Sequence, residues 1–442
     1  MSHSNRQRGH MNRRVALFGG AAGARLLLRG LATGLPVSWL TASGLARAQE
    51  MNADLPQMLI LSTSQRGDPV NINCPGSYVR GVENNPILSI EDVILGGRDP
   101  VQAAAPWAQL PAELRDQLAF IHYSSRTAAH PEFVKAMTLH GAVKTSQGNG
   151  VEMLSSALAS LAADPLNTKQ REPIPLSGET VTFEGQPLQN IKPSEIKALF
   201  EAQEDDLANL RSLRDTALDS LYRDLRSEGT RAQRKFLDRF VTSRDQARSL
   251  GEELGSLLNG LSTDPDVQDQ TEDQIIAAVA LTKLRIAPVI NITIPFGGDN
   301  HNDADLSFEA LQTTSGVQQI GFLWSQLHEQ GLGNSVSFAL QNVFGRTFTR
   351  NGQGGRNHNR YHAVMVAFGS RLRGGVYGGV NSSGAAMNID SMTGAARESG
   401  GISAELALEA AGVSLALALG HPEDLVIDRI RGGEPIRGLL RA

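Results

Sequence analysis

Two residues with metal-ligand chemistry stand two positions apart in the stretch FGGDNHNDAD. Asp299 and His301 follow the glycines Gly297 and Gly298, which allow a close backbone approach at the end of a strand. Side chains two positions apart in an extended segment point to the same side, so this carboxylate and imidazole can approach one ion together. An Asp/His set suits zinc, manganese or iron. The alternative for this pair is a turn aspartate beside a surface histidine.

A second stretch, residues 341–362 (QNVFGRTFTRNGQGGRNHNRYH), is rich in Gly, Asn and Arg and contains no acidic residue. Such a loop binds an anion, places metal ligands or turns a corner, and its residues alone leave these choices open. Arg346 offers a guanidinium for an anionic group. His358 and His362 would share a face only in a helix, but the β-like run at 363–368 predicts a strand, so we expect His362 at a strand edge.

Further polar residues follow the earlier strand-like runs. Asp68 stands in a turn after the run Met58–Leu61, within STSQRGDPVNIN. The single Cys74 has no base near it in sequence and is interpreted as a small buried hydrophobe. No motif identifies a nucleophile among the hydroxyl side chains at these positions, which are Ser64, Ser124, Ser125 and Thr127.

The elements that must position these residues alternate along the chain. β-rich runs are expected near 58–61, 119–123, 289–295, 336–340 and 363–368, and helical patterns near 151–163, 272–286 and 315–331. This alternation predicts an α/β fold with a mainly parallel sheet flanked by helices. Sites in such folds lie beyond the carboxyl ends of the strands, where the candidate residues above are expected to meet.

Residues 193–262 differ from the rest and divide the α/β domain into a first part, 49–192, and a second part, 263–442. The segment contains 13 acidic and 11 basic residues, with leucines and phenylalanines at helical spacing on either side of Gly229. We predict a helical hairpin insert packed against the sheet domain. Its charges form either a solvated face or a face that binds a partner.

Residues 1–48 have the features of an export signal. They contain seven arginines and no acidic residue, the pair Arg13 and Arg14, a modest apolar run, and a small-residue cleavage site at 46–48. The arginine pair favours the twin-arginine export machinery as a partner, and therefore a periplasmic or secreted location. The alternative is a basic amphipathic anchor that stays attached.

The charge and the apolar pattern exclude several classes of function. The whole chain carries −5, of which the signal contributes +7, so the mature part carries −12 and nucleic acid is not expected as a partner. No later apolar run reaches the roughly 18 to 20 residues of a membrane span. A single cysteine cannot form an intrachain disulfide, which fits a protein that folds before export.

Several motifs together resemble a known family: VNINCPGSYV, HPEFVKAMTLHG, IPFGGDNHND, NVFGRT, GRNHNRYH and GGVYGGV. They resemble the secreted family called domain of unknown function 1501, over residues 55 to 440. That resemblance implies a twin-arginine signal and an alkaline-phosphatase-like α/β fold related to the sulfatases. The family commonly has an acidic residue where this chain has Val343, and an aspartate where it has Asn357.

The resemblance also implies roles for individual residues. It implies one divalent ion (zinc, manganese or calcium) with ligands drawn from Asp68, Asp299, His301, Asn357 and His358. It further implies that His130, in SSRTAAHPE, lies near the site, where Arg346 steadies an anionic substrate.

Two functions of different classes follow from these expectations. The first is a metal-dependent hydrolase of phosphate or sulfate esters. The second is a catalytically degenerate periplasmic or cell-surface protein that binds an unknown partner or assists assembly. The retained Asp299, His301 and His358 favour the first, and Val343 and Asn357 favour the second.

Overall fold

The computed structural model describes residues 56–176, 180–201 and 253–441, together with isolated residues between 220 and 234. The predicted export signal and most of the predicted helical hairpin lie outside these residues. Within them, no helix is both long enough and apolar enough to cross a bilayer.

A seven-stranded sheet forms the centre of the molecule, in the order β13-β4-β12-β9-β1-β8-β5. Its strands are β1 (Met58–Ser64), β4 (Ala119–Tyr123), β5 (Ile174–Pro175), β8 (Val289–Ile292), β9 (Val336–Asn342), β12 (Ala363–Phe368) and β13 (Gly375–Tyr377). All neighbouring strands in it are parallel except β12, which runs antiparallel to both β4 and β9. The prediction of a mainly parallel sheet is therefore confirmed.

The central strands are buried along their whole length. Every residue of β1, β4, β8, β9 and β12 is buried, which explains why these strands read as near-continuous apolar runs rather than as alternating patterns. The run predicted at 289–295 is a strand only as far as Ile292, and its last residues lead into the loop that carries Asp299.

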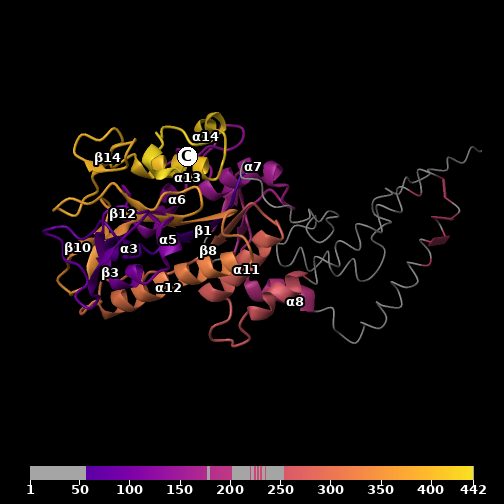
Figure 1. Cartoon of the computed structure of the whole chain (residues 1–442), viewed down its shortest axis with the longest axis horizontal. Helices are drawn as coiled ribbons and strands as arrows, with labels where there is room; N and C mark the ends of the chain where they lie inside the picture. Colours follow the sequence, from indigo (N-terminus) through magenta and orange to yellow (C-terminus); the bar gives the residue numbers. More distant parts are fainter. Residues whose placement is uncertain are drawn as a thin grey trace, which may run out of the picture.

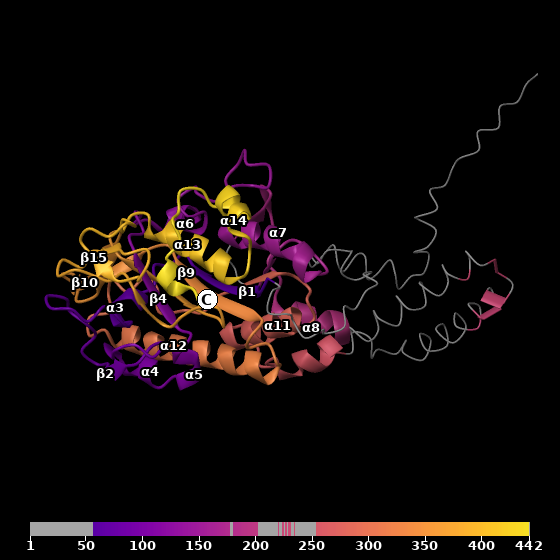
Figure 2. The same ribbon diagram turned by 45° about the horizontal axis from the view of Figure 1, so that its top comes forward.

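Helices cover both faces of the sheet, as Figures 1 and 2 show from two directions. One face is covered by α4 (Ala105–Ala108), α11 (Thr271–Lys283) and α12 (Ser307–Glu329), which share an apolar core with the sheet. A second core on the other face contains residues of α6 (Phe133–Met137), α7 (Leu154–Leu166), α13 (Ala407–Ala418) and α14 (Glu423–Arg429). The three predicted helical patterns correspond to α7, α11 and α12.

Shorter elements complete the described chain. The two-stranded sheets are β2 (Ile90–Val93) with β3 (Val101–Ala104), β6 (Thr182–Phe183) with β7 (Gln186–Pro187), β10 (Gly345–Arg350) with β11 (Arg356–Asn359), and β14 (Asn388–Ile389) with β15 (Ala396–Arg397). The remaining short helices are α3 (Val70–Asn73), α5 (Ala112–Arg115), η2 (His130–Glu132), α8 (Pro193–Glu201), η3 (Leu258–Gly260) and η4 (Arg437–Leu439).

The two ends of the charged segment join the core. Ile196 in α8 and Leu254, Leu258 and Leu261 near its other end are buried in the same apolar cluster as α11. Most of the portion between them, where the hairpin is predicted, lies outside the described residues.

The antiparallel direction of β12 decides where the site forms. Because β12 runs against its neighbours, its first residues lie at the sheet edge where β1, β4, β8 and β9 end. The β10–β11 hairpin, which connects β9 to β12, therefore also lies at that edge (Figure 1). The loops after β1, β4 and β8 meet the hairpin there.

Candidate metal centre

Three separate segments of the chain bring a carboxylate and two imidazoles together at this edge. His130 begins η2 after β4, Asp299 follows β8, and His358 lies in β11. Their potential ligand atoms all lie within 4.8 Å of one another. Asp299 is exposed and the two histidines are half-buried, so the group opens to solvent.

The backbone fixes which nitrogen of each imidazole carries the proton. His130 Nδ1 lies 2.9 Å from the carbonyl oxygen of Gln65, and His358 Nδ1 lies 2.6 Å from that of Ala128. A carbonyl only accepts, so in both rings Nδ1–H donates and a neutral ring keeps its lone pair on Nε2. Burial lowers the pKa of His358, which favours that neutral form. Metal-ligating histidines commonly carry such a hydrogen bond on the nitrogen that does not bind the ion.

His301 lies beside two members of this group. Its Nε2 is 3.0 Å from Nε2 of His358 and 3.3 Å from Oδ1 of Asp299. Asp299 and His301 do approach each other, as their two-residue spacing predicts. Because His358 Nε2 carries a lone pair, His301 Nε2–H is the donor between the two rings.

Arg346 lies behind Asp299 and is fully buried. Its Nε donates to the Gly67 carbonyl at 2.6 Å, its Nη2 to the Arg66 carbonyl at 2.9 Å, and its Nη1 lies 3.4 Å from Oδ1 of Asp299. Burial lowers the pKa of this guanidinium, whereas the charge of Asp299 raises it. The guanidinium therefore fixes the turn after β1 and compensates the charge of Asp299, instead of lying open to solvent as an anion-binding group would.

Asp68 is buried beneath the loop that carries Asp299. Its Oδ2 accepts a hydrogen bond from the Phe296 amide at 3.4 Å, while its Oδ1 has no hydrogen-bond partner in the described part of the chain. Burial raises the pKa of this carboxyl, against the hydrogen bonds from Phe296 and Ser64. A Cβ placed on Gly298 would lie 3.9 Å from Oδ1 of Asp68. Asp68 is thus close to the centre, but outside the group of His130, Asp299 and His358.

The structure takes one of the predicted ligands, Asn357, away from the centre, and it places His362 directly before β12, apart from the centre. Asn357 is exposed, and as the neighbour of His358 on β11 it points to the opposite side of the strand. Its side-chain oxygen lies 3.4 Å from Nδ2 of Asn351, in the hairpin turn. His362 is fully buried within the sheet domain, where its ring nitrogens contact Asn71 and His122.

The candidate hydroxyl nucleophiles are engaged in local hydrogen bonds. Ser124 Oγ donates to the Arg360 carbonyl at 3.1 Å, and Ser125 Oγ donates to the Thr127 carbonyl at 3.0 Å. Thr127 Oγ1 donates to the carboxylate of Glu132. Ser64 Oγ accepts a hydrogen bond from the Arg66 amide at 3.2 Å. Each of these hydroxyls therefore holds a loop in place.

Phe344 is a residue of the site that the sequence analysis did not identify. Its ring centroid lies 4.3 Å from that of His358 and 5.0 Å from that of His130, so it packs against both imidazoles. A Cβ on Gly67, which has φ +66°, would lie 1.9 Å from this ring. Glycine is therefore required at 67 for two reasons, the left-handed backbone and the space that Phe344 occupies.

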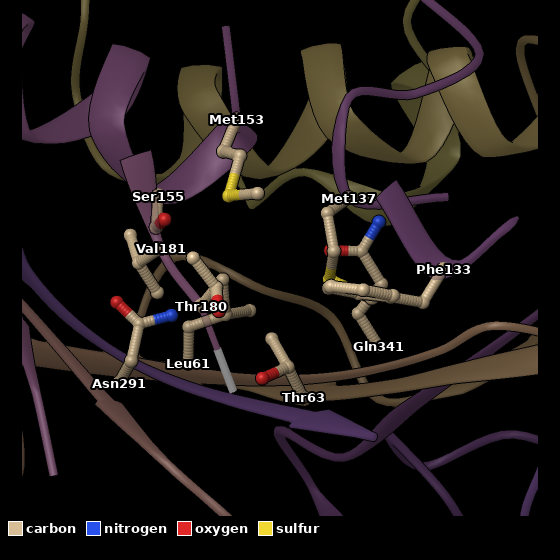
Figure 3. A pocket seen from close by; sticks show the side chains of 10 residues that line it. All are labelled: Leu61, Thr63, Phe133, Met137, Met153, Ser155, Thr180, Val181, Asn291 and Gln341. Atoms are coloured by element: carbon tan, nitrogen blue, oxygen red, sulfur yellow. The ribbon is translucent and has the colours of Figure 1, made fainter. Parts of the chain in front are cut away.

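A separate pocket lies between the sheet and the helices α6 and α7 (Figure 3). Its walls are neutral, and none of the residues that line it is charged or a histidine: Leu61, Thr63, Phe133, Met137, Met153, Ser155, Thr180, Val181, Asn291 and Gln341. The candidate metal centre is therefore distinct from this pocket.

Comparison with known proteins places the chain in a family without assigning an activity. No curated protein matches the chain. Residues 166–406, more than half of the chain, match the family described as "Protein of unknown function (DUF1501)". The matched region contains Asp299, His301, Arg346 and His358, whereas Asp68 and His130 precede it. The chain belongs to the DUF1501 family.

Proposed function

We propose that the protein is an exported hydrolase of phosphate or sulfate esters with one divalent metal ion, bound by His130, Asp299 and His358. The observation that carries this proposal is the convergence of their ligand atoms, from three separate segments of the chain, to within 4.8 Å of one another. The hydrogen bonds from Nδ1 of both histidines, which leave a lone pair on each Nε2, support the same conclusion.

The ligand set fits zinc or manganese. Two imidazoles, one carboxylate and an opening to solvent correspond to catalytic centres that keep a position for water or substrate. When bound, such an ion acts as a Lewis acid towards an ester oxygen and lowers the pKa of water.

The chain's own residues then have distinct roles. The carbonyls of Gln65 and Ala128 orient the two ligating imidazoles, and the buried Arg346 guanidinium, 3.4 Å from Asp299, offsets the charge of that carboxylate. His301 is the group that holds and transfers a proton, because its Nε2 lies 3.3 Å from Oδ1 of Asp299 and its side chain is 33% exposed. With the lone pair of His358 Nε2 committed to the ion, the His301 N–H would be available to substrate or water.

Arg66 is the residue best placed to recognise an anionic ester. Its side chain is exposed, and its aliphatic portion would lie 3.4 Å from a Cβ on Gly298, the residue before Asp299. A guanidinium binds phosphate or sulfate oxygens in a bidentate manner. Arg66 therefore replaces the buried Arg346 in our assignment of the group that contacts substrate.

The side chains at two positions, Val343 and Asn357, support a site for one metal ion rather than two. Val343 is fully buried, with its amide bonded to the Ser64 carbonyl at 3.0 Å, and Asn357 points away from the centre. Neither of the positions at which the family commonly has an acid thus supplies a carboxylate for a second ion. A chain that binds no metal and turns over no ester would instead be a periplasmic or cell-surface binding or assembly protein.

The test is the metal content and hydrolytic activity of the mature chain purified from the exported fraction. We expect about one zinc or manganese ion per chain, lost with a chelator, and metal-dependent turnover of an aryl phosphate or an aryl sulfate. Asp299→Asn should lose both properties, and Asp424→Asn, which changes an exposed aspartate in α14, should keep both. Metal binding without turnover would reject the hydrolase, and absence of metal would reject the centre as well.

Export is tested separately. Arg13→Lys with Arg14→Lys should retain the full-length precursor in the cytoplasm, because the twin-arginine machinery recognises this pair. Cell fractionation with detection of the shortened chain measures the result. Undiminished export of the double variant would reject this route.

A further inference from the structure

A completely buried ion pair lies behind the candidate metal centre. Glu309, in the first turn of α12, and Arg356, the first residue of β11, are both 0% exposed. Arg356 Nε is 2.7 Å from Glu309 Oε2, and Arg356 Nη2 is 3.2 Å from Glu309 Oε1, which makes the pair bidentate.

The pair also binds several segments of the chain that are distant in sequence. Arg356 Nη1 donates to the carbonyls of Glu83, Thr347 and Phe348 at 3.0, 3.1 and 2.9 Å. Glu309 accepts hydrogen bonds from Nδ2 of Asn73 and of Asn85, at 3.1 and 3.2 Å. These extra hydrogen bonds compensate the desolvation that a buried ion pair would otherwise suffer.

A direct connection leads from the pair to the ligands. Asn300 stands between Asp299 and His301, and its Nδ2 donates to Glu309 Oε2 at 3.0 Å. Its carbonyl accepts a hydrogen bond from the amide of Arg356 at 3.2 Å. His358 follows Arg356 by two residues on the same strand. One buried pair thus contacts both the loop that carries Asp299 and the strand that carries His358.

The backbones of these two segments also pack at the closest distance that glycine allows. A Cβ on Gly355 would lie 2.2 Å from the carbonyl oxygen of Asn300 and 2.3 Å from that of His301. Asn351 Nδ2 donates to the His301 carbonyl at 3.0 Å. The β10–β11 ladder itself is irregular, with a register shift between Arg346 and Arg350, so strand pairing alone does not fix the hairpin.

We infer that the Glu309–Arg356 pair, acting through Asn300, positions Asp299 and His358 relative to each other for metal binding. The inference rests on the proposed metal centre. Ligands from separate loops must be held within about 0.5 Å of the productive geometry. The pair supplies this constraint because its fixed, two-pronged geometry joins the two segments that carry the ligands.

The test measures Co²⁺ binding by titration, together with the visible absorption spectrum of the bound ion, which reports ligand geometry. Glu309→Gln and Arg356→Lys should weaken Co²⁺ binding by about 10- to 100-fold and change the spectrum. Glu423→Gln and Arg437→Lys, which change an exposed ion pair, are the matched controls and should leave both unchanged. A role in stability alone would lower the thermal midpoint without altering the affinity or the spectrum of the folded protein.

Two further variants keep the test decisive if a single unpaired charge prevents folding. Glu309→Leu with Arg356→Met removes both charges together. Asn300→Ala leaves the pair intact and removes only its side-chain link to the ligand loop, so it should fold and still weaken Co²⁺ binding. Unchanged affinity in Asn300→Ala would overturn the inference while the metal centre stands. Absence of Co²⁺ binding by the unmodified protein would overturn both.

Discussion

Two groups of histidines in this protein use the same ring in opposite ways. At the open edge of the sheet, His130 and His358 each donate Nδ1–H to a backbone carbonyl and direct Nε2 into a group that opens to solvent, where His358 Nε2 also contacts His301. Inside the domain, His122 and His362 are both 0% exposed, and every ring nitrogen has a protein partner. The difference shows that complete burial of the ring, rather than the spacing of histidines in sequence, distinguishes the core histidines from the candidate ligands.

The buried group forms a chain of hydrogen bonds with a defined direction. Asn71 Nδ2–H donates to His362 Nδ1 at 3.1 Å, His362 Nε2–H to His122 Nδ1 at 2.8 Å, and His122 Nε2–H to the Pro75 carbonyl at 3.0 Å. Both rings are consistently neutral in this arrangement. Asn71 also bonds the amide and the carbonyl of Arg346, at 2.8 and 3.0 Å, so the buried histidines support the start of β10.

The largest effect is expected from a substitution at the candidate metal centre. His358→Ala removes one of three ligands and should weaken divalent metal binding by on the order of 100-fold or more, exceeding the loss caused by an outer hydrogen-bond partner. Metal-free stability should change little, because the ring is half-buried and its site opens to solvent. Isothermal titration with Zn²⁺ and urea unfolding in chelator measure the two quantities. His328→Ala, an exposed histidine on α12, is the control. Equal metal affinity in both variants would remove His358 from the centre.

The opposite outcome, a loss of stability in the metal-free protein, is expected when the buried histidines are changed. His362→Ala should lower the free energy of unfolding by about 2 kcal/mol or more, because it leaves a cavity and removes partners from His122 and Asn71. Urea unfolding of the metal-free protein is the measurement. A change within about 0.5 kcal/mol, the range of ordinary surface substitutions, would show that the buried chain of hydrogen bonds contributes nothing to stability.

The sequence predicts the sheet better than the site. Continuous apolar runs identify the buried strands because both faces of the sheet are covered. The two-residue spacing of Asp299 and His301 also predicts their contact, which depends only on local geometry. Local patterns do not reveal partners that are distant in the chain. The placement of His130 depends on a carbonyl of the β1 loop, and the burial of Arg346 depends on the carbonyls of Arg66 and Gly67.

The outward direction of Asn357 also could not be predicted from local sequence patterns. Its position follows from the alternation of side chains along β11, and that strand pairs with β10 across a glycine-rich turn whose conformation the sequence does not specify. The role of Phe344 is hidden for another reason, since a buried aromatic residue after a strand is ordinarily a core residue. Only the contacts of its ring with His130 and His358 distinguish it.

The third expected effect is a dependence of stability on pH, and it also follows from the buried group. Burial lowers the pKa of His122 to about 4 and that of His362 well below its ordinary 6.5. Between pH 6.5 and 4 the unfolded chain therefore binds protons at these positions that the folded chain does not bind. The contribution of these two histidines to stability is therefore fully present above pH 6.5 and is lost as the pH falls towards 4. Each buried histidine contributes a slope of about 1.4 kcal/mol per pH unit within that window.

The slope is measured by urea unfolding of the metal-free protein at several values between pH 4.5 and 6. His122→Gln removes one titrating ring from the interior and should make the dependence of the unfolding free energy on pH flatter by about 1.4 kcal/mol per pH unit. His328→Gln, which removes an exposed ring, is the matched control. Slopes that agree between the two variants would mean that His122 takes up protons in the folded state as readily as in the unfolded chain. The assignment of neutral rings in the hydrogen-bonded series from Asn71 to Pro75 would then be wrong. A protonated His122 has no lone pair with which to accept the hydrogen bond from His362.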